Sequence, residues 1–283
     1  MTYGPLNKLR TELHTPVGYA LPVGEATVAL NPLVGQRLSL EFSGEIRCIA
    51  CGRKTSKSFQ QGYCYPCMRS LAQCDLCIVK PELCHYAQGT CREPEWGRAH
   101  CMQTHYVYLA NSSGAKVGIT RASQIPTRWI DQGAKQALRI IEVATRHQAG
   151  LLEVAFARHV ADKSNWTRLL REEAPDVDLG ALRDALYAAC AKDIAEMTER
   201  FGPDAIRMLP DEAGMALTYP VLAYPQKVHA LSFDKTPRIT GTLQGIKGQY
   251  LILDCGVFNI RKHAGYCAKV VPGDAIEQAA GGA

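Results

Sequence analysis

The sequence has no uninterrupted apolar stretch of the roughly 18 residues that a membrane-spanning helix needs. The first sixteen residues carry no apolar run after their charges, so no secretory leader is expected. Low-complexity sequence is confined to the tail at 279–283. These absences argue against a membrane protein and against a largely disordered one, and they predict a cytoplasmic protein built of folded domains.

Cysteine, by contrast, is abundant. The 283 residues include 12 cysteines, and nine of them lie between Cys48 and Cys101. In a reducing compartment, clustered cysteines indicate metal binding or redox chemistry and not disulfides. The other three are scattered, and we expect them to be small buried hydrophobic residues: Cys190, Cys255 and Cys267.

The first four cysteines have the spacing of a zinc ribbon. Two Cys-x₂-Cys pairs, Cys48/Cys51 and Cys64/Cys67, are separated by twelve residues. Each pair aims two sulfurs at one point, and two such pairs complete a tetrahedral site. Because four protein ligands leave no open position for water, the predicted zinc is structural and not hydrolytic.

A second set of five thiols follows, one more than a four-coordinate site accepts: Cys74, Cys77, Cys84, Cys91 and Cys101, with His85, His100 and His105 nearby. Either Cys74 and Cys77 act as a Cys-x₂-Cys pair, or Cys74 only packs and the other four bind metal. A second zinc is the expected occupant. Four thiolates would also hold an iron–sulfur cluster, and both alternatives stay open.

Positive charge is concentrated in one part of the chain. The formal net charge of +5 falls to about +1 if two four-thiolate zinc sites each contribute −2. Residues 106–150 hold six Lys and Arg against two Asp and Glu, whereas 151–214 hold eight against thirteen. The first of these segments is therefore the better place to expect a phosphate-bearing partner.

Apolar patterning predicts an α+β protein with four parts: a β-rich arm at 1–47, zinc-binding module(s) at 48–105, a small α/β domain with trailing helices at 106–214, and a small β-barrel-like unit at 215–283. Within the third part, strands at 106–110 and 116–120 flank the turn 111–114 and predict a hairpin. A short helix at 126–136, a strand at 138–144 and helices at 149–170 and 179–201 should follow. The two ends of the chain share a strand-rich texture and are expected to pair in one β-module.

From residue 106 onward the sequence resembles the GIY-YIG endonuclease superfamily. The resemblance covers about 106–170 and rests on an ordered set of motifs: YVY, KVGIT, TRW and a later helix. By that resemblance, the following residues correspond to catalytic positions: Tyr108 on the first strand, Lys116 on the second, Arg128 on the first helix, Glu153 as the ligand of Mg²⁺ or Mn²⁺, and Asn165 twelve residues later. Tyr106, Gly118 and Arg121 are the expected substrate-binding residues.

The residue types suit phosphodiester hydrolysis, which needs a divalent cation, an activated water and cationic donors. One departure stands out, because Lys116 occupies the place where the superfamily usually has a second tyrosine. A lysine could bind phosphate or act as a base, or it could mark a member that binds nucleic acid without cutting it. The ordinary alternatives are a structural Tyr108, a solvated Glu153 and a turn residue at Asn165.

Over its whole length the chain resembles an uncharacterised bacterial and archaeal family, through stretches such as CGRKTSKSFQQGYCYPC, PELCHYAQGTCREPEWG and PTRWIDQGA. That resemblance implies no activity. The leading functional hypothesis is a zinc-containing, metal-dependent nuclease acting on DNA or RNA. The alternatives are a non-catalytic nucleic-acid- or ribosome-binding adapter, and a thiol-based redox or metal-responsive regulator.

Overall fold

We describe a computed structural model of the chain that covers residues 1–161 and 165–273. The chain forms two compact units. Unit 1 combines Met1–Arg69, Leu170–Glu172 and the chain from Thr218 onward, and unit 2 combines Ser70–Leu169 with Glu173–Leu217. Within the described ranges, no helix combines the length and apolarity needed to cross a bilayer.

Unit 1 is built on one large sheet whose central strand comes from the N-terminal part of the chain. The strand β5 (Arg37–Arg47) pairs on one side with β13 and on the other with β16, both antiparallel. The full order is β1-β16-β5-β13-β14-β15-β12, with β6 beside β5. The bounds are Thr2–Pro5 for β1, Lys54–Thr55 for β6, Ala230–Leu231 for β12, Arg238–Lys247 for β13, Tyr250–Leu253 for β14, Gly256–Asn259 for β15 and Tyr266–Pro272 for β16.

Unit 1 also has a small antiparallel sheet in the order β2-β3-β4. Its strands are Arg10–Glu12, Gly18–Val23 and Ala26–Ala29. The expectation that both ends of the chain contribute to one β-structure is confirmed by the β1–β16 and β5–β16 pairings. The C-terminal strands complete a sheet that the N-terminal segment begins. The division into four parts at 47, 105 and 214 stays a prediction.

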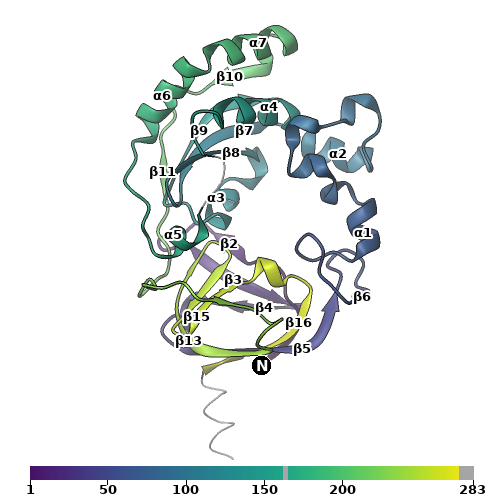
Figure 1. The fold of residues 1–283 in the computed structure, drawn as a ribbon, viewed down its shortest axis with the longest axis vertical. Helices are drawn as coiled ribbons and strands as arrows, with labels where there is room; N and C mark the ends of the chain where they lie inside the picture. Colours follow the sequence, from purple (N-terminus) through teal and green to yellow (C-terminus); the bar gives the residue numbers. More distant parts are fainter. Residues whose placement is uncertain (162–164, 274–283) are drawn as a thin grey trace, which may run out of the picture. The chain divides into compact units, whose positions relative to one another are not determined.

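Unit 2 is an antiparallel sheet with helices on both faces (Figure 1). The strands run in the order β10-β9-β7-β8, with β11 also on β9. Their bounds are His105–Asn111 for β7, Ala115–Arg121 for β8, Gln136–Val143 for β9, Ile206–Met208 for β10 and Met215–Ala216 for β11. Alternate side chains of the β7–β8 hairpin, among them Val107 and Val117, pack with the helices in one buried core.

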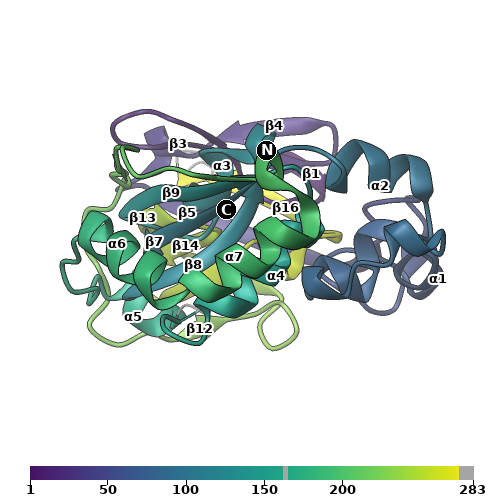
Figure 2. The same ribbon diagram turned by 90° about the horizontal axis from the view of Figure 1, so that it is seen from above.

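The core face is covered by α4 (Arg146–Phe156), α6 (Leu179–Ala189) and α7 (Ala191–Phe201), and Figure 2 shows α6 and α7 lying across the sheet. The short helix α3 (Thr127–Asp131) lies on the other face, where Trp129 makes an edge contact with Tyr108 at 6.0 Å between ring centroids. The predicted hairpin and the predicted strand at 138–144 are confirmed. The mixed α+β class is confirmed as well.

The helical predictions were partly wrong. In place of one helix at 179–201 there are two, which meet at Cys190 because its backbone (φ −104°, ψ 15°) leaves helical geometry. In place of one at 149–170 there are α4 and α5 (Trp166–Leu170), and residues 162–164 of that prediction lie outside the described residues. Helix α3 is shorter than predicted, since the chain turns at Gly133 with φ +65°.

A cysteine-rich segment of short turns begins unit 2 and ends in α2 (Pro94–Cys101). Its 3-10 turn Pro81–Leu83 packs directly against α4. The closest approach is at Gly150, where a Cβ would lie 2.6 Å from Pro81 Cγ and 2.7 Å from the backbone nitrogen of Glu82. Arg146 adds a hydrogen bond, with Nη2 donating to the carbonyl oxygen of Ile78 at 2.7 Å.

Candidate functional site

The first four thiols meet at one point in unit 1. Cys48 follows β5, and Cys64 and Cys67 lie at the start of α1 (Tyr65–Ser70). The sulfurs of Cys48, Cys51, Cys64 and Cys67 all lie within 4.8 Å of one another. The Cys51 and Cys64 sulfurs are 3.8 Å apart. That distance is about the edge of a tetrahedron with 2.3 Å zinc–sulfur bonds.

The backbone around these thiols prepares them to bind a cation. Burial alone would raise the pKa of Cys48, but backbone N–H groups of Cys64, Cys51 and Ala50 donate to its sulfur and lower the pKa to about 6. Burial and the three neighbouring sulfurs raise the pKa of Cys67 to about 12. A divalent cation would remove that repulsion by binding all four sulfurs as thiolates. The group therefore fits a structural zinc, as the ribbon spacing predicts.

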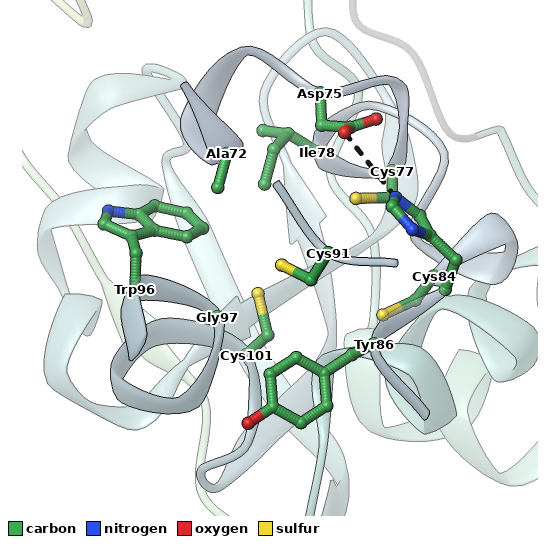
Figure 3. Close-up of a pocket in the computed structure, with 11 residues that line it drawn as sticks. Ala72, Asp75, Cys77, Ile78, Cys84, Tyr86, Cys91, Trp96, Gly97 and Cys101 are labelled. Atoms are coloured by element: carbon green, nitrogen blue, oxygen red, sulfur yellow. Dashed lines mark ion pairs between the residues drawn. The ribbon is translucent and has the colours of Figure 1, made fainter. Parts of the chain in front are cut away.

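The second set of thiols surrounds an apolar pocket in unit 2. Figure 3 shows the sulfurs of four cysteines around it: Cys77, Cys84, Cys91 and Cys101. Burial, and after it the charges of Asp75 and the other three thiols, raise the pKa of the Cys77 thiol to about 11. Cys74 is buried but is not part of the lining. The structure thus favours the alternative in which Cys74 only packs.

A mixed ligand group lies at one side of this pocket. Ligand atoms of Asp75, Cys77 and His85 lie within 4.8 Å of one another. The carboxylate of Asp75, however, already pairs with Arg92 Nε at 2.7 Å and with His85 Nε2 at 3.5 Å. Two of the three ligands are therefore engaged with each other.

The hairpin brings Tyr108, Arg128 and Glu153 together. Tyr108 is fully buried, and its phenol donates a hydrogen bond to Gln132 Oε1 at 2.8 Å. Burial raises the pKa of Tyr108, the charge and hydrogen bond of Arg128 lower it, and the charge of Glu153 raises it again. Arg128 is therefore within hydrogen-bonding reach of the phenol, and Glu153 is near enough for its charge to act on it.

The ring of Tyr108 lies over Gly118, its partner on β8. A Cβ at Gly118 would come within 2.7 Å of both the phenol oxygen and Cζ, so only glycine leaves room for this ring. Strand β8 is the edge strand of the sheet. Side chains from α3 and α4, which lie on opposite faces of the sheet, can therefore approach each other around this edge.

Tyr106, Lys116 and Arg121 lie on the same hairpin as Tyr108. Tyr106 is covered by Arg139, whose Cζ is 4.9 Å from the ring centroid, and is hydrogen-bonded to Glu142. Lys116 is buried at the start of β8, opposite Ala110 and on the same face as Gly118. Arg121 lies beside Cys101 and His105, whose pKa values its charge lowers.

Asn165 acts as a helix cap. Its Oδ1 accepts hydrogen bonds from the backbone N–H groups of Thr167 and Arg168, each at 3.1 Å, at the start of α5. Its own backbone N–H donates to Ser113 Oγ at 2.8 Å. The side chain therefore caps the start of a helix, which agrees with the turn-residue alternative.

Sequence reasoning missed Arg146. Burial lowers its pKa, and it lies close enough to Cys101, Arg128, Glu153 and Cys77 to interact with the charge of each. It follows Thr145, whose side chain forms a reciprocal capping box with Gln148 at the start of α4. The signal available in the sequence was an arginine in the first helical turn, where the helix dipole disfavours a cation. We call Tyr108, Gln132, Arg128, Glu153 and Arg146 the hairpin cluster.

Comparisons of the chain with curated proteins and with solved structures return no match. One family model, described as a protein of unknown function (DUF2797), matches residues 35–268. That range includes both thiol groups and the whole hairpin cluster. The match covers most of the 283 residues, so the chain belongs to the DUF2797 family of proteins of unknown function.

Proposed function

We propose that the protein is a zinc-containing nucleic-acid-processing protein whose hairpin cluster hydrolyses phosphodiester bonds with the help of Mg²⁺ or Mn²⁺. The observation that carries the proposal is that Tyr108 packs against α3 through Trp129 and Gln132, while α4, which carries Glu153, packs on the same hairpin. Tyr108, Arg128 and Glu153 come from β7, α3 and α4. They supply the hydroxyl, the guanidinium and the carboxylate that the resemblance assigns to a catalytic site.

Each group has a role that follows from its surroundings. Arg128 would bind the scissile phosphate, because its planar guanidinium can donate two parallel hydrogen bonds to phosphate oxygens. Glu153 would hold a divalent cation, which would supply an activated water for attack on the phosphorus. With Arg146 beside them, the three charged side chains sum to +1, which favours an anionic substrate.

Tyr108 has a positioning role in this proposal. Its raised pKa keeps the phenol protonated, so it can donate to Gln132 while it accepts a hydrogen bond from Arg128. A buried neutral phenol does not deprotonate water, but it fixes the direction of the guanidinium. Tyr108 would therefore not be the base, and activation of the water would rest on the cation held by Glu153. The zinc in unit 1 would stabilise structure and take no part in the reaction.

The test is cleavage of 5′-labelled single- and double-stranded DNA and RNA by the full chain with Mg²⁺ or Mn²⁺. Glu153→Gln should lower the cleavage rate by about 100-fold or more, since it removes the metal ligand. Glu196→Gln is the matched control, because Glu196 is an exposed side chain of α7, and it should retain full activity. Cleavage that persists undiminished in Glu153→Gln, or its absence from the wild type with all four substrates, would contradict the proposal.

A second candidate is a nucleic-acid- or ribosome-binding adapter that does not cut. The observation in its favour is that the Tyr108 side chain has no exposed surface while Lys116 replaces the second tyrosine. Such an adapter would bind the same labelled nucleic acids equally well in EDTA and in Mg²⁺. A nuclease should instead bind more weakly in EDTA, because the cation bridges Glu153 and the phosphate.

A further inference from the structure

The spacing of the four pocket cysteines along the chain differs from that of a zinc site. Cys77, Cys84, Cys91 and Cys101 are separated by six, six and nine residues. A structural zinc site is usually assembled from pairs separated by two to four residues, because one tight turn then aims both sulfurs at the same ion. The Cys48–Cys67 site has two such pairs, and the pocket has none.

The sulfurs also lie farther apart in space than zinc allows. Around zinc they would be about 3.8 Å from one another, as Cys51 and Cys64 are. In the pocket, where all four cysteines are among the described residues, no three of the sulfurs lie within 4.8 Å of one another. Yet all four line the same pocket.

We propose that these four thiolates hold a [4Fe–4S] cluster. In such a cluster each cysteine binds a different iron at a corner of a cube, so the sulfurs stand about 6 Å apart around the cluster. The lining is mostly apolar, with Ala72, Ile78 and Trp96 (Figure 3), and its one carboxylate, Asp75, pairs with Arg92 and His85. On binding a preformed cluster, each thiol would lose one proton to water, and its sulfur would replace one terminal thiolate or water ligand of the cluster, which leaves, with no electron transferred.

Two arginines whose Nε–H groups are buried provide an independent argument for an anionic group here. The Nε–H groups of Arg121 and Arg146 are buried and have no hydrogen-bond acceptor among the described residues. Arg146 donates a hydrogen bond to the carbonyl oxygen of Ile78, a residue of the pocket lining, and Arg121 lies at the end of β8, opposite His105. A buried N–H requires an acceptor, and a guanidinium that carries it favours an anion. A [4Fe–4S]²⁺ cluster with four thiolates carries −2, and its sulfurs accept N–H hydrogen bonds.

The cluster would join the cysteine-rich segment to the helix that carries Glu153. Cys77, Cys84 and Cys91 come from the turns before α2, and Cys101 is the last residue of α2. These turns pack on α4 at Gly150 and bond to Arg146. Because short turns bury little apolar surface, the cluster would supply much of the segment's stability.

The test is analysis of the full chain purified without oxygen. We expect about four iron and four acid-labile sulfide per chain, with a broad absorbance at about 400 nm. About one zinc should be present as well, from the Cys48–Cys67 site. Protein with about two zinc and no iron, before and after treatment with iron and sulfide, would overturn the proposal, as would a two-iron cluster by Mössbauer spectroscopy.

Variants separate the pocket from its alternatives. Cys84→Ser and Cys101→Ser should each lower the iron content roughly fourfold or more while about one zinc remains. Cys74→Ser is the matched control, a buried cysteine of the same segment outside the lining, and it should keep its iron. His85→Gln should also keep its iron, and loss of iron in either control would assign the metal to a different ligand set.

Discussion

Replacement of Gly150 by alanine sets two physical effects against each other. Gly150 lies in the middle of α4, and in an exposed helix alanine is more stable than glycine by about 1 kcal/mol. The added Cβ, however, would lie 2.6 Å from Pro81 Cγ, 2.7 Å from Pro81 Cβ and 2.7 Å from the backbone nitrogen of Glu82. Neither a proline ring nor a backbone nitrogen can rotate away, so the turn must move off the helix.

Overpacking of this kind costs about 1–3 kcal/mol, and three contacts below 3.0 Å place it toward the upper end. After the gain in helix propensity is subtracted, we expect Gly150→Ala to lower the free energy of unfolding of unit 2 by about 1–2 kcal/mol. For a unit of this size that corresponds to a fall in Tm of roughly 3–6 °C.

The assay is thermal unfolding followed by far-UV circular dichroism, with Val154→Ala as the control. Val154 is an exposed side chain on the same helix, so its replacement should change the free energy of unfolding by less than about 0.5 kcal/mol. If Gly150→Ala raises the Tm, the turn does not pack on α4 as described, and the structural link between the thiol pocket and the hairpin cluster fails.

Three further predictions follow from other parts of the molecule. In a urea titration, Gly118→Ala should destabilise unit 2 by about 1–3 kcal/mol, because its Cβ would lie 2.7 Å from the Tyr108 ring. The control Gly214→Ala, whose Cβ has its nearest contact at 3.7 Å, should lower the free energy of unfolding much less. Cys51→Ser should abolish zinc binding at the Cys48–Cys67 site and raise the rate of amide hydrogen exchange at 48–69. Amides of β7 and β9 should stay protected, since unit 2 has its own core, and loss of protection throughout the chain would contradict this. His105 is fully buried, and burial together with the charges of Arg146 and Arg121 lowers its pKa to about 4. The stability that the neutral side chain contributes is therefore complete above about pH 6.5 and is lost as the pH falls toward 4. His105→Asn should flatten the pH dependence of unfolding in that window by up to about 1.4 kcal/mol per pH unit, and equal slopes in the two proteins would refute the assignment.

The parts of the fold that depend on neighbouring residues could be predicted from the sequence. The hairpin of unit 2 follows from alternation on both sides of a four-residue turn, and the first metal site follows from two close cysteine pairs. The large sheet of unit 1 could not be assigned in this way. There β5 pairs with a strand about 200 residues away, as the 2.7 Å contact between Ser39 Oγ and Thr240 Oγ1 shows, and no local pattern encodes that choice.

The second thiol group shows the same limit at a smaller scale. Cys74 and Cys77 have the spacing of a zinc pair, yet only Cys77 lines the pocket. Its partners are chosen by how the turns wrap against α4, and the turns are placed by contacts of Gly150 and Arg146. Spacing therefore predicts a ligand set only where one turn delivers both ligands, and it fails where tertiary packing delivers them one at a time.

Arg146 connects the two proposals physically. Its guanidinium lies near Cys77 and Cys101 and also near Arg128 and Glu153. Without an anionic cluster, the charge of Arg146 would be balanced in part by Glu153, and a carboxylate paired with arginine binds a divalent cation weakly. With a cluster of charge −2 in the pocket, the thiolates balance Arg146 instead, and Glu153 can bind Mg²⁺. The electrostatics of the hairpin cluster therefore depend on what the thiol pocket holds, and loss of the cluster should weaken Mg²⁺ binding at Glu153 even where the fold of unit 2 survives.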